Sequence, residues 1–252
     1  MDVKGLGAIV TGGGSGLGAE TARFLAAAGA KVTVLDLNQE TVEAVAKEIG
    51  GLGLVCDVSS AADAEAAVAK AHEAHGPCRV MVNCAGIAPA KRIVGRDGAM
   101  PLEAFEKVIS VNLIGSFNLL RLAAADMLAA EPVNEDGERG VIISTASIAA
   151  VEGQLGQVAY SASKAGIVGM MLPAAREFAK NGVRVLTIAP GLIGTPLLLN
   201  MPQEVQDNLA SQVPFPHRFG HSSEYAKLVM HICENTMLNA DTIRLDGAMR
   251  MQ

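Results

Sequence analysis

The chain has 252 residues, of which half are apolar and 18% are charged, and its net charge is −6. That length is enough for one large α/β domain or for two small ones. The acidic balance, without any basic stripe, argues against a nucleic-acid-binding surface. Aromatic residues are scarce and Trp is absent, so Ala, Val, Ile, Leu and Met must build the core.

The sequence shows no membrane, metal or disulfide signal. No run reaches the ~18 uninterrupted apolar residues of a membrane span, so we expect no membrane contact. The cysteines show neither a C-x-x-C pair nor metal-ligand spacing, so we expect free thiols and no metal site. They are Cys56, Cys78, Cys84 and Cys233. A strand pattern begins almost at the first residue, which leaves no room for a targeting segment. We therefore expect a cytoplasmic protein, although a processed mitochondrial form would have the same sequence.

The first motif is a glycine-rich stretch. An apolar run at residues 6–11 is followed by GGGSGLG and then by a helical pattern at 19–28. This order places backbone N–H groups and a helix N-terminus against a pyrophosphate. The glycines fit both G-x-G-x-x-A and TG-x-x-x-G-x-G, and we favour the second because Gly12 follows the strand directly. A lone glycine loop is also typical of an ordinary turn, so the interpretation depends on its context.

An acidic residue ends the second apolar run. Residues 31–35 lead to Asp36, which lies eighteen residues after Gly18. A carboxylate at the tip of the second strand can accept both ribose hydroxyls of adenosine and would repel the additional phosphate of NADP. Neither the glycine loop nor the next two residues offer a Lys or Arg for that phosphate. The sequence therefore predicts NAD as the cofactor.

The middle of the chain alternates helical and apolar patterns. We expect helices at residues 39–49, 63–75 and 102–130, and strands at 52–56, 80–82 and 141–144. Asp57 follows the third strand, where it can bond the adenine amino group. NCAG at 83–86 follows the fourth strand, and its small residues allow a cofactor close to the backbone. Cys84 is then a wall of the cofactor site or simply a buried small side chain.

Two features of the middle region lack a regular pattern. Residues 87–101 form a longer connection than the usual ~2–6 residues. It carries Lys91, Arg92 and Arg96, which fit either a phosphorylated substrate tail or ordinary solvated charges. Asn112 interrupts an apolar helix, where a buried amide must be hydrogen-bonded. We expect it to hold a kink and a water that relays protons to Lys164.

The stretch from 147 to 164, SIAAVEGQLGQVAYSASK, carries three reactive groups: Ser147, Tyr160 and Lys164. Lys164 follows Tyr160 by four residues, so in a helix both side chains leave the same face. Lowering the pKa of a phenol from ~10 to about 7 requires roughly 4 kcal/mol of preferential stabilisation of the phenolate, and a nearby ammonium supplies part of it. We predict that Tyr160 takes or gives a proton while Ser147 holds a substrate oxygen. This spacing alone occurs by chance in many helices, and the other motifs favour the chemical interpretation.

The last third of the chain continues the alternation. Helical periodicity runs to about residue 181, a sixth strand follows at 184–188, and a helix at 223–234 precedes a last strand at 242–246. Residues 192–219 are apolar and rich in Pro, which fits a mobile lid over an apolar substrate. A partner-facing or core-packing segment would look the same.

These patterns predict a fold class. The seven strand runs mostly lack in/out alternation and are separated by helices, which indicates a parallel sheet buried on both faces. We therefore expect an α/β, doubly wound, parallel seven-stranded sheet with helices on both faces. No composition break, linker or repeat divides the chain, so residues 1–252 are predicted to be one domain. In such sheets the ligand binds beyond the carboxyl ends of the strands, where each motif falls.

The motifs together resemble the short-chain dehydrogenase/reductase superfamily over the full length of the chain. They are TGGGSGLG, Asp36, NCAG, Asn112, Ser147, YSASK at 160–164 and PG at 190–191. The chain is also similar to a narrower group, the type 2 3-hydroxyacyl-CoA dehydrogenases, also called 17β-hydroxysteroid dehydrogenase type 10. That likeness lies in GVIISTASIAAVEGQLGQVAYSASKAGIVGM, TIAPGLIGTPLL, ASQVPFP and IRLDGAMRMQ, and in the long loop at 87–101.

The resemblance implies a homotetramer with a Rossmann fold that oxidises secondary alcohols with NAD. It implies that Tyr160 is the acid/base, that Lys164 binds the nicotinamide ribose and lowers the pKa of Tyr160, that Ser147 orients the carbonyl, and that Asn112 holds the relay water. With the glycine loop, the expected cofactor-binding set is Gly12, Ser15, Gly16, Leu17, Gly18, Asp36, Asp57, Val58, Cys84, Ala85, Gly86, Tyr160, Lys164, Pro190, Ile193 and Thr195. The expected substrate set is Ser147, Gln154, Gln157 and Tyr160.

Three functions remain open at this stage. The first is interconversion of 3-hydroxyacyl-CoA and 3-oxoacyl-CoA, including short branched acyl groups. The second is reduction of 3-oxoacyl-carrier protein or oxidation of steroids and other secondary alcohols; Asp36 disfavours the carrier-protein reductase, which usually uses NADPH. The third is a non-catalytic NAD-binding scaffold, which the presence of Tyr160, Lys164, Ser147 and Asn112 together disfavours.

Overall fold

A parallel sheet of seven strands forms the centre of the computed structural model, which describes residues 1–251, apart from the side chains of Pro196 and Leu197. The strands lie in the order β3-β2-β1-β4-β7-β8-β9, and every neighbouring pair is parallel. Their bounds are β1 (Gly7–Thr11), β2 (Lys31–Asp36), β3 (Leu52–Val55), β4 (Cys78–Asn83), β7 (Gly140–Thr145), β8 (Val183–Pro190) and β9 (Thr242–Leu245). The predicted doubly wound α/β fold is confirmed, with each strand within three residues of its expected bounds.

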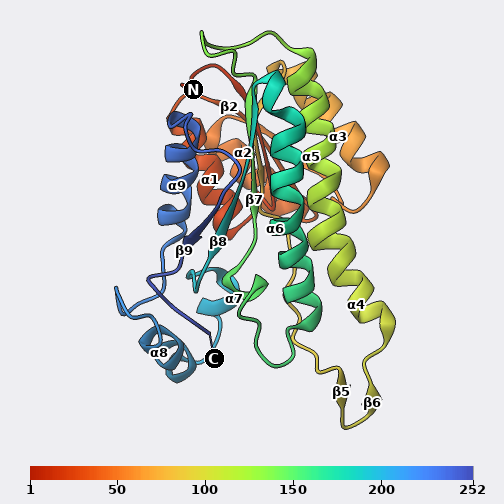
Figure 1. Ribbon diagram of the computed structural model, residues 1–252, viewed down its shortest axis with the longest axis vertical. Coiled ribbons are helices and arrows are strands. Elements are labelled where there is room, and N and C mark those ends of the chain that lie inside the picture. The colour runs from red at the N-terminus through yellow and green to blue at the C-terminus, as the bar shows by residue number, and fades with distance from the viewer. Residues whose placement is uncertain (252) are drawn as a thin grey trace.

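Helices cover both faces of this sheet (Figure 1). The helices of the described residues are α1 (Gly16–Ala27), α2 (Gln39–Ile49), α3 (Ala61–His75), α4 (Leu102–Ile109), α5 (Gly115–Ala129), α6 (Val158–Phe178), α7 (Pro196–Leu199), α8 (Gln203–Ser211) and α9 (Ser222–Glu234), of which α7 and α8 lie beyond the end of the sheet. The first begins at Gly16, three residues before the expected start, because the glycines that suggested a loop continue into the helix. Short 3₁₀ turns at Ile148–Ala150 and Ala179–Asn181 flank α6.

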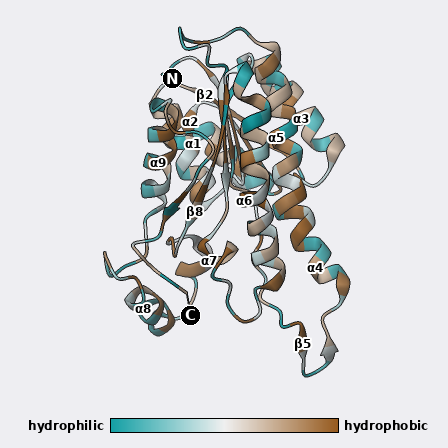
Figure 2. Ribbon diagram, in the orientation of Figure 1, coloured by the Kyte–Doolittle hydropathy of each residue, from teal (hydrophilic) through white to brown (hydrophobic). Residues whose placement is uncertain are grey.

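Alternate strand residues build two apolar layers. One side of the sheet packs against α1, α2 and α9, with Val10, Val34 and Val82 among the strand residues that reach them. The other side packs against α3, α5 and α6, with Met81 and Ile142 at its centre. Figure 2 shows the strands coloured as hydrophobic between these helices. Burial on both faces explains why the strand runs lack polar alternation.

The long helical stretch at Leu102–Ala129 is interrupted by a π-helical turn at Ser110–Ile114. The interruption contains Asn112, and it confirms that the amide marks an irregularity in the helix. By length and composition this stretch could cross a bilayer, with a mean hydropathy of 1.5 over its best window, which the uninterrupted-run criterion missed. Half of that window is buried within the protein, as in a helix that packs on a sheet, so this is weak evidence for a membrane.

The two less regular segments also have local structure. Residues 87–101 contain a small antiparallel hairpin, β5 (Val94–Gly95) and β6 (Gly98–Ala99), which projects from the body of the protein (Figure 1). The segment 192–219, expected to be a lid, contains α7 and α8. It is attached to the body through Ile193, which is 6% exposed and pairs with Gly220.

Candidate active site

The glycine loop lies against the end of β4. The hydroxyl of Thr11 accepts hydrogen bonds from the backbone N–H groups of Cys84 (3.1 Å) and Ala85 (3.0 Å). Gly12 has a positive φ of 62°, and a Cβ there would lie 2.9 Å from Ala85 N. Only glycine fits this conformation and this approach. Thr11 therefore holds the glycine loop against the turn after β4, a role that the sequence motif alone did not indicate.

The same loop leaves a cradle in front of α1. A Cβ on Gly18 would lie 2.2 Å from Gly12 O, so the helix and loop touch through backbone. Ser15 precedes the helix in extended conformation, and its side chain makes no capping bond to the first-turn N–H groups. Those donors and the positive end of the helix dipole suit a phosphate. The residues present thus fit a dinucleotide.

Asp36 stands beside this cradle at the end of β2. Its Oδ2 accepts from Gly14 N (3.0 Å) and its Oδ1 accepts from Asn38 N (3.1 Å). Each carboxylate oxygen has a further lone pair for a ribose hydroxyl. A Cβ on Gly14 would lie 3.0 Å from the Asp36 carboxyl carbon, so the loop passes directly over the carboxylate.

Asp57 and Val58 follow β3 at the same edge of the sheet. Asp57 Oδ1 accepts from Ser59 N (2.9 Å) and Ser59 Oγ (2.7 Å), which fixes the turn. The Val58 side chain is buried, and a Cβ on Gly115 would lie 2.5 Å from Val58 Cγ2. Any contact of Val58 with a cofactor would therefore involve its backbone.

A buried polar cluster lies behind Cys84. The hydroxyl of Thr145 donates to Asn83 O (2.6 Å) and lies 2.7 Å from the hydroxyl of Tyr225, which is 3.7 Å from Cys84 Sγ. Burial raises the pKa of the Cys84 thiol, so it remains protonated at neutral pH. No sequence pattern pointed to Tyr225, which comes from α9 and lies 141 positions from Cys84, so the two meet only through the tertiary fold.

Lys164 is attached to this cluster. Its Nζ donates to Thr145 O (2.7 Å) and lies 5.6 Å from the centre of the Tyr160 ring, one turn away on α6. The side chain is 4% exposed, and burial lowers the pKa of the amine to about 8. A Cβ on Gly86 would lie 3.6 Å from this Nζ, so the turn after β4 passes close to the amine.

Tyr160 and Ser147 face each other across the start of α6. Burial raises the pKa of the Tyr160 phenol, and a hydrogen bond with Ser147 lowers it in part. In the protein without a cofactor, burial outweighs this hydrogen bond, and the lowering of the pKa of Tyr160 by Lys164 remains a prediction. Ser147 Oγ also accepts from Ala149 N (3.1 Å), which orients it at the first turn after β7.

Asn112 uses all of its hydrogen-bonding atoms within the protein. Its Oδ1 accepts from Ile87 N (2.8 Å), and its Nδ2 donates to Ile87 O (2.9 Å) and Ser163 Oγ (3.0 Å). Ser163 in turn donates to Tyr160 O (2.7 Å). The side chain therefore fixes the turn after β4 to the first turn of α6. The predicted relay water remains a prediction.

The remaining predicted residues lie around these groups. Gln157 Oε1 accepts from Gln154 N (2.9 Å), so one glutamine braces the turn that carries the other. Pro190 ends β8, and beyond it Ile193 O accepts from Thr195 N (2.7 Å). Ile193 is buried, so its side chain is a packing group.

Two other features lie apart from this edge. A cavity of about 380 Å³ is lined by Met1, Asp2, Val3, Ala28, Met230 and Glu234, near the start of β1. No reactive cluster accompanies it among the described residues, so we place the chemistry at the strand ends instead. His72 Nδ1 on α3 lies 2.6 Å from Asp126 Oδ1 on α5, but this pair joins two helices and is not at the strand ends.

The chain is similar to known proteins along most of its length. The family model for short chain dehydrogenase matches residues 7–206. A 3-hydroxyacyl-CoA dehydrogenase type-2 from Bos taurus is 54% identical, covering 99% of this chain and 97% of the relative. An ipsdienol dehydrogenase from Ips pini is 35% identical, covering 96% of each chain.

A solved structure is also similar. The crystal structure of 3-hydroxyacyl-CoA dehydrogenase type-2 from Mycobacterium avium superposes with a TM-score of 0.91 at 42% identity, covering 98% of this chain and 97% of that one. The family match covers most of the chain, and the relatives align along nearly all of it. The chain belongs to the short-chain dehydrogenase family and is an oxidoreductase that uses a nicotinamide cofactor.

Proposed function

We propose that this protein interconverts 3-hydroxyacyl-CoA and 3-oxoacyl-CoA, short branched acyl groups included, with NAD as the cofactor. The observation that carries the proposal is the placement of Ser147, Tyr160 and Lys164 together at the strand ends, next to a glycine cradle. The substrate class is supported by the relatives from Bos taurus and Mycobacterium avium, which are named for it and align over nearly the whole chain.

The residues divide the chemistry among them. A nicotinamide cofactor bound in the glycine cradle would supply the hydride acceptor and, in its oxidised form, a positive charge. Ser147 holds the substrate oxygen, and Tyr160 accepts the hydroxyl proton as the carbonyl forms. Because burial raises the pKa of Tyr160, the phenol needs additional positive charge nearby to act as a base at neutral pH. In the reverse direction the same phenol donates the proton.

The preference for NAD over NADP rests on Asp36. Its carboxylate stands beside the loop at Gly14, where the additional phosphate of NADP would meet a negative charge. Asp36→Asn keeps an oxygen acceptor for the loop and removes the charge, so the ratio of NADP to NAD affinity should rise at least tenfold. Titration of both dinucleotides by protein fluorescence or calorimetry measures it, and an unchanged ratio would count against the ribose role.

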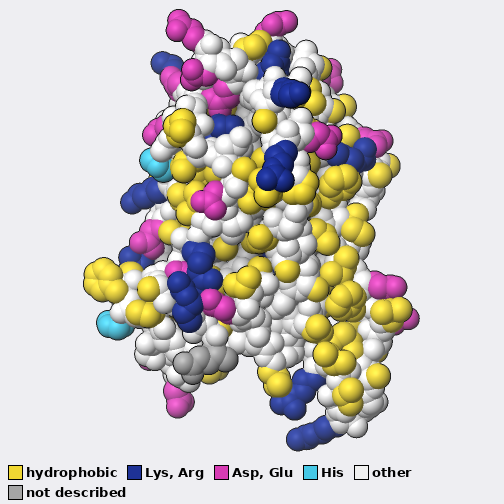
Figure 3. Space-filling model, viewed as in Figure 1, with side chains coloured by type: hydrophobic (Ala, Val, Ile, Leu, Met, Phe, Trp, Pro, Cys, Tyr) yellow, Lys and Arg dark blue, Asp and Glu magenta, His cyan; other side chains and the backbone are white. Residues whose placement is uncertain are grey.

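The acyl-CoA assignment also fits the surface near the site. Lys91, Arg92 and Arg96 are exposed on the 87–101 segment, and Lys91 N donates to Gly156 O (2.8 Å), which joins this segment to the loop after Ser147. Figure 3 shows Lys and Arg side chains beside the projecting hairpin. Such cations suit the phosphates of a coenzyme A tail.

The experiment that tests the function is a substrate panel combined with one variant. Wild-type protein should oxidise 3-hydroxyacyl-CoA with NAD, and Tyr160→Phe should lower kcat at least a thousandfold while NAD affinity stays within about twofold. Acyl-CoA substrates of different length and branching define the preferred chain. Full turnover by Tyr160→Phe would remove the acid/base assignment.

A second candidate is oxidation of a secondary alcohol that carries no coenzyme A. The relative from Ips pini, an ipsdienol dehydrogenase by name, favours it at 35% identity. Assays with free secondary alcohols, steroids and acyl-carrier protein beside the acyl-CoA panel separate the two. A higher kcat/KM for a free alcohol would select this second function.

We also propose a homotetramer. The helical stretch at Leu102–Ala129 exposes large apolar side chains, among them Ile114 and Phe117, each about half exposed at 50% and 52%. Large apolar side chains exposed on one helical stretch suit contact with another copy. Light scattering after gel filtration measures the mass in solution, and a monomer would refute the assembly.

A further inference from the structure

The loop at residues 147–157 joins β7 to α6 and begins with Ser147. Its internal bonds are short-range: Glu152 N donates to Ile148 O (3.0 Å), and Gln157 N donates to Gln154 O (3.0 Å). Val151 is 77% exposed and Leu155 is 76% exposed, so the tip has little packing. Local bonds shape such a turn without fixing it relative to the sheet. Contacts from outside the loop must therefore hold it in place.

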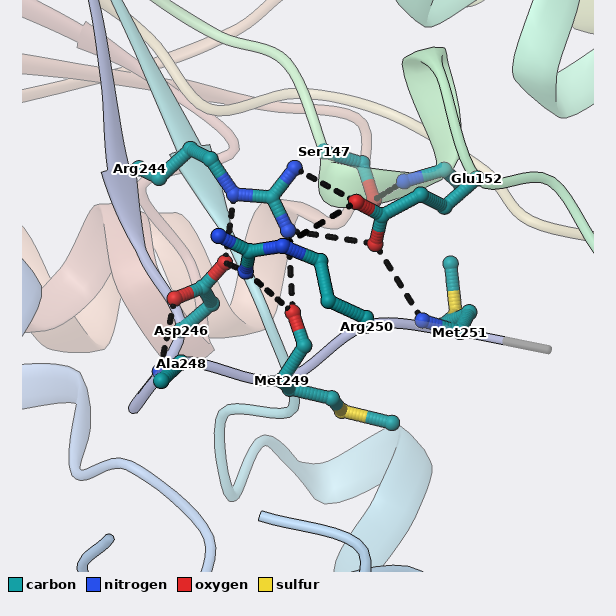
Figure 4. Close-up of polar contacts among 9 residues, drawn as sticks. Ser147, Glu152, Arg244, Asp246, Ala248, Met249, Arg250 and Met251 are labelled. Atoms are coloured by element: carbon teal, nitrogen blue, oxygen red, sulfur yellow. Dashed lines mark hydrogen bonds and ion pairs between the residues drawn. The ribbon is translucent and has the colours of Figure 1, made fainter. Parts of the chain in front are cut away.

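Glu152 is the loop side chain that makes ion pairs with another part of the protein. Arg244 donates from Nη1 to Oε1 (2.9 Å) and from Nη2 to Oε2 (3.1 Å), a two-point pairing that fixes direction as well as distance. The backbone N–H of Met251 donates to Oε2 (3.2 Å), and Arg250 Nε lies 3.6 Å from Oε1. Figure 4 shows these donors converging on the carboxylate. The pairing holds the pKa of Glu152 below its usual value, so the group is charged at neutral pH.

Arg244 is itself rigidly placed. It lies in β9, where it pairs with Ala189 of β8. Its Nε donates to Asp246 Oδ2 (2.6 Å), and its Nη2 also donates to Met249 O (2.9 Å). The guanidinium is therefore held by the edge of the sheet and by the residues that follow it. Through this group Glu152 is fixed to the sheet.

The C-terminal segment, residues 246–251, also packs against the loop. Met249 is 1% exposed, Ile148 2% and Val213 4%, and the three form one apolar cluster with Leu192 and Met251 against it. Ile148 directly follows Ser147, whereas Val213 lies just beyond α8. One segment thus contacts both the loop at 147–157 and the segment at 192–219.

Gly247 shows how closely these parts approach. Its φ is +60°, and a Cβ there would lie 2.6 Å from Val213 Cγ1 and 2.7 Å from Phe215 O. Its carbonyl accepts from Phe215 N (3.2 Å). A side chain at this position would push the segment at 192–219 away.

We propose that Glu152 is a positioning residue for the substrate. Glu152 binds the loop at 147–157 to Arg244 and to the C-terminal segment, which also packs against the 192–219 segment. It thereby fixes the position of Ser147 relative to the 192–219 segment, and these two parts form opposite sides of the acyl site. The dinucleotide cradle at Gly12, Gly18 and Asp36 lies on other strands and does not depend on this anchor. The inference rests on the proposed function only for the identity of the substrate.

The test compares Glu152→Gln with Glu48→Gln. Glu48 makes an equivalent two-point pair with Arg23 (2.8 Å for both bonds) on α1 and α2, so this control loses the same chemistry elsewhere. Glu152→Gln should raise KM for 3-hydroxyacyl-CoA about tenfold, with KM for NAD within twofold of wild type. The control should change neither. Loss of affinity for both ligands together would indicate general damage and overturn the proposal.

Hydrogen exchange by mass spectrometry gives a readout without substrate. In Glu152→Gln, amides at 147–157 and 213–215 should exchange about tenfold faster than in wild type, while those of β1 and α1 stay unchanged. Unchanged exchange in the loop would refute the anchor whatever the substrate is. If wild-type protein fails to oxidise any acyl-CoA, the proposed function fails, and the exchange measurement still decides the role of Glu152.

Discussion

Replacing Lys164 by Met should stabilise the protein while it removes turnover. The side chain is 4% exposed, and burial lowers the pKa of its amine from 10.5 to about 8. Keeping the amine charged at pH 7 therefore costs the folded state about 3 kcal/mol. The bond to Thr145 O offsets about 1 kcal/mol of this cost. Met fills similar space without charge, so we expect a gain of about 2 kcal/mol, or about 4–8 °C in Tm.

The effect should depend on pH in a defined direction. Between about pH 8 and 10.5 the unfolded chain binds more protons at this lysine than the folded chain, so wild-type stability rises with pH in that window. The advantage of Lys164→Met should therefore shrink to about 0.5 kcal/mol at pH 9.5. Urea unfolding at both pH values and one protein concentration measures it, with Lys70→Met on the exposed face of α3 as the control. Two results would refute the reasoning. One is a Lys164→Met protein that is less stable than wild type at pH 7, and the other is a difference in unfolding free energy between the two proteins that does not change with pH.

Two further predictions concern the cofactor and the proton. Gly18→Ala places a methyl group 2.2 Å from Gly12 O and should weaken NADH binding more than tenfold, as measured by the fluorescence of the nucleotide. Gly169→Ala is the control, because its methyl group meets no atom within 4 Å. Equal NADH affinities of the two variants would contradict the proposed dinucleotide cradle. Because burial raises the pKa of Tyr160, kcat/KM for alcohol oxidation should rise from pH 6 to pH 10 as phenolate forms, whereas ketone reduction should fall. Profiles that rise in both directions would exclude this phenol as the shared group.

The sequence predicted the fold well because its signals are local. Buried parallel strands appear as short apolar runs, and their alternation with helices indicates a parallel sheet, whereas the order of the strands was not predicted. In the sequence, the π-helical turn was indicated only by Asn112, a polar residue within an otherwise apolar helical pattern. The helices α7 and α8 were missed, since Pro and apolar residues in that segment suggested a lid without regular structure.

The site was predicted in part for a related reason. Gly12, Asp36, Tyr160 and Lys164 follow spacings that a single strand end or helix turn imposes, and the structure gathers them at one edge. Partners that meet through the tertiary fold leave no such spacing. Glu152 and Arg244 are 92 positions apart, so their pairing could not be read from the sequence. The effect of burial on the pKa of Tyr160 could not be read from the sequence either, because it depends on neighbours that meet through the tertiary fold.

The hydrogen bonds of Asp36 have a consequence for protein engineering. The carboxylate that would discriminate between dinucleotides also accepts the N–H groups of Gly14 and Asn38, and so braces the loop over the phosphate cradle. A designer who installs Arg or Ala there to admit NADP also removes this brace. The redesigned enzyme would then bind either dinucleotide poorly until a second substitution supplies a new acceptor. A change of cofactor preference in this chain thus requires new hydrogen-bond acceptors for the loop as well as a change of charge.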